Sequence, residues 1–303
     1  MDKTSKERTN LMSQISPDQT PLLYRLTNDY LFRAVFQTRP KALEGLCRSV
    51  LHLTEKDTIS VTLRNPIELG QKINSREFIL DLAVIINESI FLNLEMQMYR
   101  DPYWIERSVS YTCRSYDNLN RGDSYSMVLP VIHIGFLNYD LFPEYPEFCA
   151  TYKLANVKNH NIYSDSLCIS VVNLNQIRLA AKEDKAFGLT LWAQVFNAES
   201  WEEINMLAQQ NEYLKEAVSG VAVLTEDEKI RQQCQAREDF EYWERMKKLR
   251  HQRELDELKS QYQAQLDEQK NQYQAQLDNL KNQYQRELDR LNARLNSLES
   301  QNR

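Results

Sequence analysis

Residues 76–100 read REFILDLAVIINESIFLNLEMQMYR, and this stretch decides the fold. It contains two apolar segments, Ile79 to Ile86 and Ile90 to Met98, on either side of the polar triplet Asn87-Glu88-Ser89. Nearly every residue of the first segment is apolar, which is typical of a strand buried on both faces. A short polar linker between two such segments predicts a β-hairpin. We therefore expect a buried hairpin here, with its turn at residues 87–89.

Three polar side chains stand out in this hairpin: Asp81, Glu95 and Gln97. Because strand side chains alternate, Glu95 and Gln97 share one side of the second strand. A carboxylate on each of two neighbouring buried strands is costly unless positive charge compensates it. Spacing leaves two compensations open. One is ion pairing with Lys72, Arg76 or an arginine of the following helix, and the other is a divalent metal ion bound through oxygen.

The metal interpretation of Asp81 and Glu95 carries a specific chemistry. A hard divalent cation lowers the pKa of a bound water and neutralises charge that develops on a scissile phosphate. Gln97 lies on the same side as Glu95, so it can orient the attacking water or a phosphate oxygen. The hairpin is therefore either a metal-dependent catalytic site or a pair of buried ion pairs.

Length and charge limit the wider possibilities. With 303 residues, the chain can bury a substantial core and form more than one structural unit. Its net charge of −6 gives no global positive field, which weakens a nucleic-acid interpretation but leaves room for a local basic face. The polar N-terminus and the lack of an 18-residue apolar run predict neither a signal peptide nor a transmembrane helix.

The cysteines indicate the compartment. They are scattered, form no C-x-x-C pair and are odd in number, as expected of reduced thiols in a cytoplasmic protein. They predict neither a disulfide framework nor a zinc site. The five are Cys47, Cys113, Cys149, Cys168 and Cys234.

The segment before the hairpin is expected to start with a disordered tail at residues 1–20. Thr27 or Asn28 then caps a predicted helix that has Asp29 in its first turn. Spacing alone favours a helix-dipole role for Asp29. The helix should bury an apolar stripe, and a second helix, a short strand and a loop should follow. The stripe is Tyr30, Leu31, Ala34 and Val35; the second helix spans Lys41 to Leu53, the strand Ile59 to Leu63, and the loop residues 67–75.

The segment after the hairpin predicts a helix from Tyr103 to Leu119, with Gly122 as its C-cap. Arg107 and Arg114 lie seven residues apart, about two helical turns with a drift of roughly 20°. They form one cationic line, which is either an ordinary solvated face or a phosphate-binding line beside the carboxylates.

Further strands and helices complete the first part of the chain. Met127 to Leu137 predicts a central strand in which His133 is expected to be a core histidine rather than a ligand. Another strand and three packing helices follow. They span Ser166 to Leu174, Phe187 to Phe196, Trp201 to Leu207 and Tyr213 to Val223.

The last part of the chain predicts one long helix. Residues 225–228 have the form of a capping box, and neither glycine nor proline follows. An eleven-residue repeat aligns tyrosines and leucines, which indicates a straight or right-handed supercoil. Self-association through residues 255–298 is the natural inference, and an isolated charged helix is the alternative. The aligned residues are Tyr262, Tyr273 and Tyr284, with Leu255, Leu266, Leu277 and Leu288.

The order of motifs resembles the PD-(D/E)xK nuclease core and, more narrowly, the Rpn family of recombination-promoting nucleases and transposases. The family features are Asn28-Asp29-Tyr30-Leu31-Phe32, Ile79-Leu80-Asp81-Leu82, Asn93-Leu94-Glu95-Met96-Gln97, Arg107 and Pro130-Val131-Ile132-His133-Ile134. The resemblance implies an α/β core with a mixed sheet flanked by helices. We expect a disordered tail (1–20), this core (21–145), a strand and helical extension (146–224), and a coiled-coil helix (225–303).

The resemblance also implies a function: a Mg²⁺- or Mn²⁺-dependent DNA endonuclease associated with recombination or mobile elements. Asp81 and Glu95 would be the metal ligands, and Asp29 a further acid near the metal. Gln97 occupies the position where most of the superfamily has lysine, so its role is orientation.

Positive charge would then come from other residues. Lys72 and Arg76 are expected to supply the missing charge, and Arg107 and Arg114 to contact phosphate. The alternative is a catalytically inactive DNA-binding or scaffolding protein that oligomerises through its coiled coil.

Overall fold

The computed structural model describes residues 20–64, 67–68, 78–79, 81–117 and 124–301. The chain forms two compact units, Met1–Glu238 and Asp239–Arg303. The first unit contains all the strands and all but one of the described helices, and the second consists of the greater part of one long helix.

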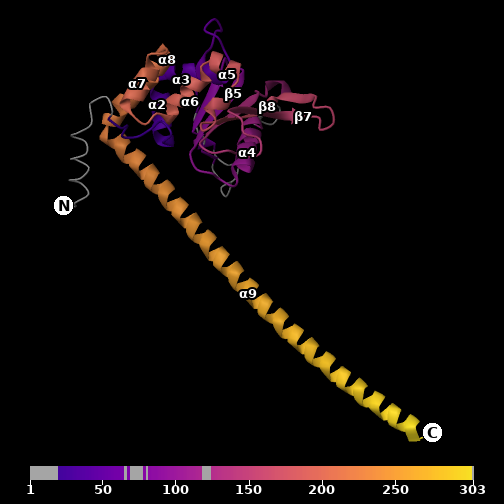
Figure 1. Cartoon of the computed structure of the whole chain (residues 1–303). Helices are drawn as coiled ribbons and strands as arrows, with labels where there is room; N and C mark the ends of the chain where they lie inside the picture. Colours follow the sequence, from indigo (N-terminus) through magenta and orange to yellow (C-terminus); the bar gives the residue numbers. More distant parts are fainter. Residues whose placement is uncertain (1–19, 65–66, 69–77, 80, 118–123, 302–303) are drawn as a thin grey trace, which may run out of the picture. The chain divides into compact units, whose positions relative to one another are not determined.

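The first unit is built on a six-stranded sheet of order β1-β4-β5-β6-β8-β7 (Figure 1). β5, β6 and β8 run parallel to one another, and the other neighbours pair antiparallel, so the predicted mixed sheet is confirmed. Strands β7 and β8 of this sheet come after residue 145, where the core was expected to end. The strands are β1 (Val61–Leu63), β4 (Leu82–Ile86), β5 (Ile90–Gln97), β6 (Val131–Leu137), β7 (Cys149–Ala155) and β8 (Ile162–Asn173); β2 (Ile67–Glu68) and β3 (Phe78–Ile79) form a separate pair.

The predicted hairpin is the β4–β5 pair, and its turn lies at residues 87–89 as expected. Asn87 and Glu88 adopt positive φ values of 50° and 55°. The Asn87 side chain fixes the turn, because its Oδ1 accepts a hydrogen bond from the Ser60 amide at 2.7 Å. One prediction was wrong: the segment from Ile79 to Ile86 is not a single strand, since β4 begins only at Leu82 and Asp81 lies at a bend before it.

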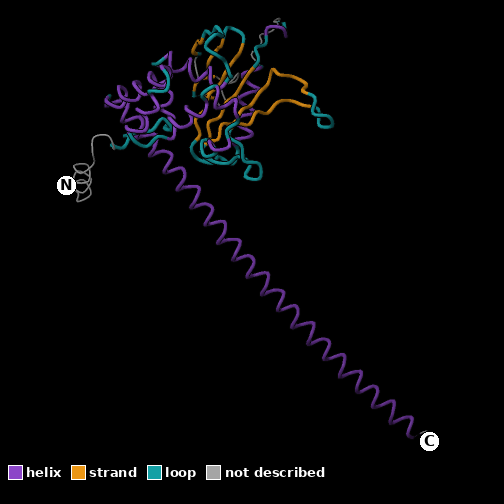
Figure 2. The backbone as a smooth tube through the Cα atoms, turned by 45° about the horizontal axis from the view of Figure 1, so that its top comes forward, coloured by secondary structure: helices purple, strands orange, loops and turns teal. Residues whose placement is uncertain are grey.

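Helices cover both faces of this sheet. On one face, α2, α3, α6 and α8 contribute to a core that includes Leu92, Leu94 and Met96 of β5. On the other face, α4 packs against β6 and β8 and covers Ala83, Phe91 and their neighbours. Figure 2 shows most helices gathered beside the strands. The helices are α2 (Asp29–Thr38), α3 (Pro40–Val50), α4 (Trp104–Tyr116), α5 (Lys182–Ala186), α6 (Leu189–Asn197), α7 (Trp201–Ala208) and α8 (Glu212–Glu226), with 3-10 turns at Tyr125–Met127 and Ile177–Leu179.

The first helix confirms its predicted cap but not its predicted stripe. The Asn28 side chain accepts hydrogen bonds from the amides of Tyr30 and Leu31. Tyr30 and Ala34 are only partly buried, because the buried side of the helix is rotated toward its phenylalanines. The buried apolar residues are Leu31, Phe32, Val35 and Phe36.

Several predicted boundaries shift because neighbouring turns end the elements earlier. α3 stops at Val50 and α4 at Tyr116, and the predicted C-cap Gly122 lies outside the described residues. The strand expected from Met127 begins at Val131, since a 3-10 turn and Pro130 precede it. Strand β7 and helix α5 were not predicted. β7 is a largely exposed edge strand, so the apolar pattern of a buried strand is missing.

The long helix α9 (Glu228–Gln301) begins at the last residue of the predicted capping box, 225–228. Thr225 belongs to α8, where its hydroxyl donates to the Val221 carbonyl at 2.7 Å. Asp227 caps α9 instead, because its carboxylate accepts from the Ile230 amide at 3.1 Å. Among the described helices, none is long and apolar enough to span a bilayer.

Candidate active site at the end of strand β5

The two predicted metal ligands, Asp81 and Glu95, lie together. The β4–β5 register pairs Leu82 with Leu94, and Asp81 and Glu95 are the residues next to that pair in the two segments. The Asp81 carboxylate accepts a hydrogen bond from the Met96 amide at 2.9 Å, which holds the bend before β4 against the second strand. Glu95 is buried on the α4 side of β5, with 8% of its surface exposed.

Burial makes this pair of acids electrostatically costly. Burial, together with the neighbouring Glu95 and Asp29, raises the pKa of Asp81 to about 8, although the Met96 amide and Arg33 oppose the shift. Burial also raises the pKa of Glu95, against the lowering effect of Arg107. The carboxylates therefore have a net excess of negative charge that the surrounding side chains only partly offset.

Arg107 is a cation that contacts Glu95, the acid of β5. Its Nη2 donates to Glu95 Oε1 at 2.5 Å and to Gln97 Oε1 at 2.6 Å, and its Nη1 donates to Asp101 Oδ2 at 2.9 Å. The ion pair between Glu95 and an arginine of the following helix, one of the two compensations left open by the sequence, is therefore present. Gln97 lies on the same side as Glu95, and its amide also donates to the Tyr99 carbonyl.

Asp29 lies close enough to raise the pKa of Asp81, as expected of a further acid near the site. Its carboxylate is bound by Arg237 of α9, with the closest N–O distance 2.7 Å. The Asn28 side chain, next to it, donates to the Cys234 carbonyl at 3.1 Å. The first turns of α9 therefore pack beside the start of α2 at the edge of the acid cluster.

The other predicted cations are Lys72, Arg76 and Arg114. Lys72 and Arg76 lie outside the described residues. Arg114 is on α4, seven residues beyond Arg107, and is partly buried. Contact of Arg107 and Arg114 with phosphate stays a prediction.

His133 is buried, as predicted for a core histidine, but it also borders the site. Its Nε2 lies 3.4 Å from Glu95 Oε2, and its Nδ1 lies 2.7 Å from the Asn93 side-chain nitrogen. Burial, together with the positive charge of Arg107, lowers the pKa of His133 to about 3. The ring is therefore neutral at physiological pH.

Sequence reasoning missed five neighbours of the cluster. Two of them had local signals: Arg33 lies four residues after Asp29 on the same helix face, and Asn93 alternates with Glu95 along β5. The other three are Asp101 from a loop, His133 from a neighbouring strand and Arg237 from a distant helix.

The donor set suits a hard divalent cation. In the described part of the chain, no group of three or more His, Cys, Asp or Glu side chains forms a metal site. Mg²⁺ is nevertheless commonly bound by only one or two carboxylates together with waters and phosphate oxygens. Glu95 Oε2 is buried and has no hydrogen-bond partner among the described residues, so it can act as one ligand oxygen, with Asp81 as the second carboxylate.

Comparisons with known proteins support the resemblance seen in the sequence. Searches of curated proteins and of solved structures found no match. A family model described as PD-(D/E)XK nuclease family transposase matches residues 26–251, which include the acid cluster and the start of α9. Because this match covers well over half of the chain, the protein belongs to the PD-(D/E)XK nuclease family transposases.

Proposed function

We propose that the protein is a Mg²⁺- or Mn²⁺-dependent DNA endonuclease that acts in the cytoplasm, in recombination or mobile-element biology. The observation that carries this proposal is the meeting of Asp81 and Glu95 at the end of β5. Two partly compensated carboxylates are what a divalent cation would neutralise. All five cysteines are free, in keeping with a reducing compartment.

Each group in the cluster has a separate task in this proposal. Asp81 and Glu95 would hold the cation, which supplies charge neutralisation at the phosphate and activation of water when it is bound. Asp29 adds negative charge beside Asp81. Gln97 orients the attacking water or a phosphate oxygen through the face that it shares with Glu95.

Arg107 supports the catalytic reading of Gln97. The Gln97 carbonyl oxygen binds the Arg107 guanidinium at 2.6 Å, which brings a positive charge to the position that lysine occupies in most of the superfamily. A guanidinium bound to Glu95 and Gln97 can turn its remaining donors toward a phosphate. Hydrolysis then adds water across one P–O bond: the water oxygen bonds to phosphorus, and the departing ester oxygen takes a proton.

Cleavage of supercoiled plasmid by the purified full chain tests this function. We expect nicking with Mg²⁺ or Mn²⁺ that falls at least about 100-fold in Asp81→Asn and in Glu95→Gln, because each removes a charge that the cation requires. The matched control is Glu88→Gln, which removes one carboxylate from the exposed hairpin turn. Cleavage that persists in both site variants would refute the proposal.

A second candidate is a DNA-binding or scaffolding protein without catalysis. The ion pair between Arg107 and Glu95 favours it, since this pair offsets one acid without any metal. Calorimetric titration with Mn²⁺ separates the two functions. A catalytic site must bind the ion with the site acids intact, whereas a scaffold can show no binding and still retain DNA in a mobility-shift assay.

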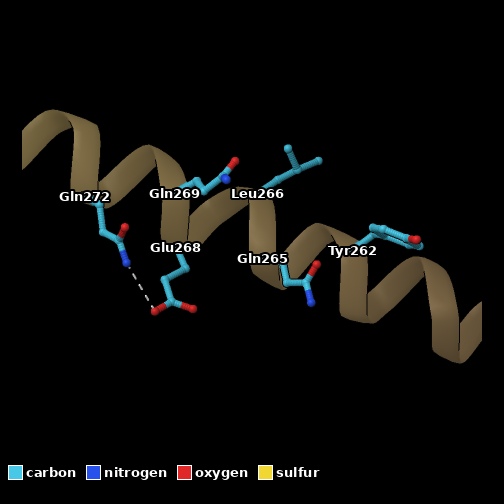
Figure 3. Close-up of a pocket in the computed structure, with 6 residues that line it drawn as sticks. All are labelled: Tyr262, Gln265, Leu266, Glu268, Gln269 and Gln272. Atoms are coloured by element: carbon cyan, nitrogen blue, oxygen red, sulfur yellow. Dashed lines mark hydrogen bonds between the residues drawn. The ribbon is translucent and has the colours of Figure 1, made fainter.

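We further propose that α9 associates with a second copy of the chain. Figure 3 shows Tyr262, Leu266 and Gln269 on one side of the helix, with the hydrogen-bonded pair Glu268 and Gln272 on the other. The apolar side stays exposed, with Tyr262 61% and Leu266 59% accessible. The six side chains drawn in Figure 3 all belong to α9, and in the described part of the unit no other element covers Tyr262 or Leu266.

Sedimentation of the full chain tests this association. Leu277→Glu with Leu288→Glu places charge in the apolar stripe and is expected to give monomers. Asn271→Glu with Asn282→Glu adds the same charge on the opposite side of the helix, nine residues after Tyr262 and Tyr273, and should leave the oligomer intact. A monomeric unmutated chain would refute the association.

A further inference from the structure

The most informative unassigned group is His133, because it is buried and faces the site. Its ring is fully buried on β6, directly opposite Asn93 in the parallel β5–β6 register. The rings of Trp104 and Tyr111 lie 5.9 and 6.4 Å from its centre and close it off on the α4 side. The imidazole therefore has only a few polar neighbours. These neighbours determine which ring nitrogen donates a hydrogen bond and which accepts one.

The Asn93 side chain sets the proton position on the ring. Its Nδ2 lies 2.7 Å from His133 Nδ1. In this orientation of the amide, Nδ2 donates and Nδ1 accepts, and a neutral ring then carries its hydrogen on Nε2. A donor on that nitrogen needs a partner, because a buried N–H without one is costly.

The partner available to Nε2 is the second oxygen of Glu95. His133 Nε2 and Glu95 Oε2 are 3.4 Å apart, slightly longer than an ordinary N–H···O hydrogen bond. Both atoms are buried and neither makes a hydrogen bond in the described residues, so a small approach would satisfy both. The opposite tautomer would direct a nitrogen lone pair at a carboxylate oxygen, which is repulsive in a buried site.

We propose that Asn93 and His133 are positioning residues for Glu95. Asn93 fixes the tautomer of His133, and the Nε2–H of His133 holds Glu95 Oε2, while Arg107 holds Oε1 from the other side. The plane of the carboxylate is thus fixed by two donors. This inference rests on the proposed role of Glu95 as a metal ligand, and it explains why the second donor is neutral: it orients the carboxylate without cancelling the charge that a cation needs.

The first test is spectroscopic and independent of activity. Long-range proton–nitrogen correlation spectra of the ¹⁵N-labelled full chain report which ring nitrogen of each histidine bears hydrogen, and loss of one signal set in His133→Gln assigns His133. We expect a hydrogen on Nε2 and none on Nδ1. Asn93→Leu should produce a mixture of tautomers, because it removes the donor to Nδ1. A hydrogen on Nδ1 in the unmutated protein would overturn the proposal.

The second test measures Mn²⁺ affinity with matched variants. His133→Phe keeps a planar ring but removes the donor and should weaken Mn²⁺ binding about 10- to 100-fold. His133→Gln restores a donor at a similar reach and should lie within about threefold of the unmutated chain. Equal losses in both variants would overturn the positioning role. If the unmutated chain binds no Mn²⁺, the proposed function fails, while the nitrogen spectra still decide the tautomer.

Discussion

The β4–β5 hairpin and the part of α9 beyond Glu238 use the same residue types with opposite results. Leu94 of β5 is fully buried, whereas Leu277 of α9 is 52% exposed, although each lies on a regular apolar stripe. The hairpin stripe meets α2 and its neighbours within one chain. A periodic pattern thus predicts that a face will be covered, but only tertiary structure shows whether the cover comes from the same chain.

The acids of the two regions differ in the same way. In α9 the repeat places a glutamine four residues before an aspartate, and the pairs Gln263–Asp267 and Gln274–Asp278 are each hydrogen-bonded at 3.1 Å on the exposed surface. These aspartates stay in water. Asp81 and Glu95 are instead gathered beside each other, with Glu95 buried and Asp81 partly buried, at a cost in stability that surface acids do not bear.

The largest expected effect comes from truncating a leucine in each region. Leu94→Ala removes a fully buried side chain and should lower the free energy of unfolding by about 2–5 kcal/mol, measured by denaturant titration of the fluorescence of Trp104 and Trp192. Leu277→Ala should leave that transition unchanged and weaken only the concentration-dependent association. Equal losses would contradict the contrast between the two stripes.

A smaller effect is expected from overpacking next to the site. Gly135 lies opposite Glu95 in the register, and a Cβ added there would lie 2.3 Å from Trp104 Cζ2. Gly135→Ala should therefore cost about 1–3 kcal/mol, because the indole ring must move.

Thermal unfolding measures this cost. Ser164→Ala on β8, a small change on a partly buried surface, serves as the control. A Gly135→Ala variant as stable as the unmutated chain would show that Trp104 moves freely and that α4 packs loosely on β6.

The acid cluster predicts a pH dependence that the tail should lack. Asp81 has a folded pKa of about 8, against roughly 3.9 when unfolded, so between these values the folded state holds a proton that the unfolded state has lost. Stability should then fall as pH rises from about 4 to 8 and level off above. Asp81→Asn should raise the free energy of unfolding at pH 8 by roughly 0.5–2 kcal/mol and have little effect at pH 4.

Metal addition sharpens that comparison. Mn²⁺ at pH 8 should raise the melting temperature of the unmutated chain and not that of Asp81→Asn, because only the former offers both carboxylates. If the free energy of unfolding of Asp81→Asn changes with pH as it does in the unmutated chain, the pH dependence belongs to other titratable groups.

Local pattern was sufficient to predict the centre of the site. Alternation along β5 placed Glu95 and Gln97 on one side, and the turn at residues 87–89 brought Asp81 back beside them. The Asn28 cap and the long helix were likewise predicted, since each depends on periodicity or on a few adjacent residues, whereas the mixed sheet was expected from the resemblance.

Long-range contacts were beyond the reach of the pattern. The seven-residue spacing of Arg107 predicted a cationic line but not that its guanidinium binds Glu95, because the angle of α4 to the sheet is a tertiary property. His133 meets Asn93 only through a parallel register joined by α4. Arg237 is 208 residues from Asp29, and no local signal links the two.

The smallest expected effect lies where α9 meets the site. Arg237 binds Asp29, but its side chain is 36% exposed, so water screens the pair and Arg237→Gln should cost less than about 1 kcal/mol. A double-mutant cycle with Asp29→Asn isolates the pair, and Arg250→Gln farther along α9 is the control. A measurable coupling energy would show that the first turns of α9 belong energetically to the first compact unit. Strict additivity of the two substitutions would show that the contact between Arg237 and Asp29 does not couple α9 to the first compact unit.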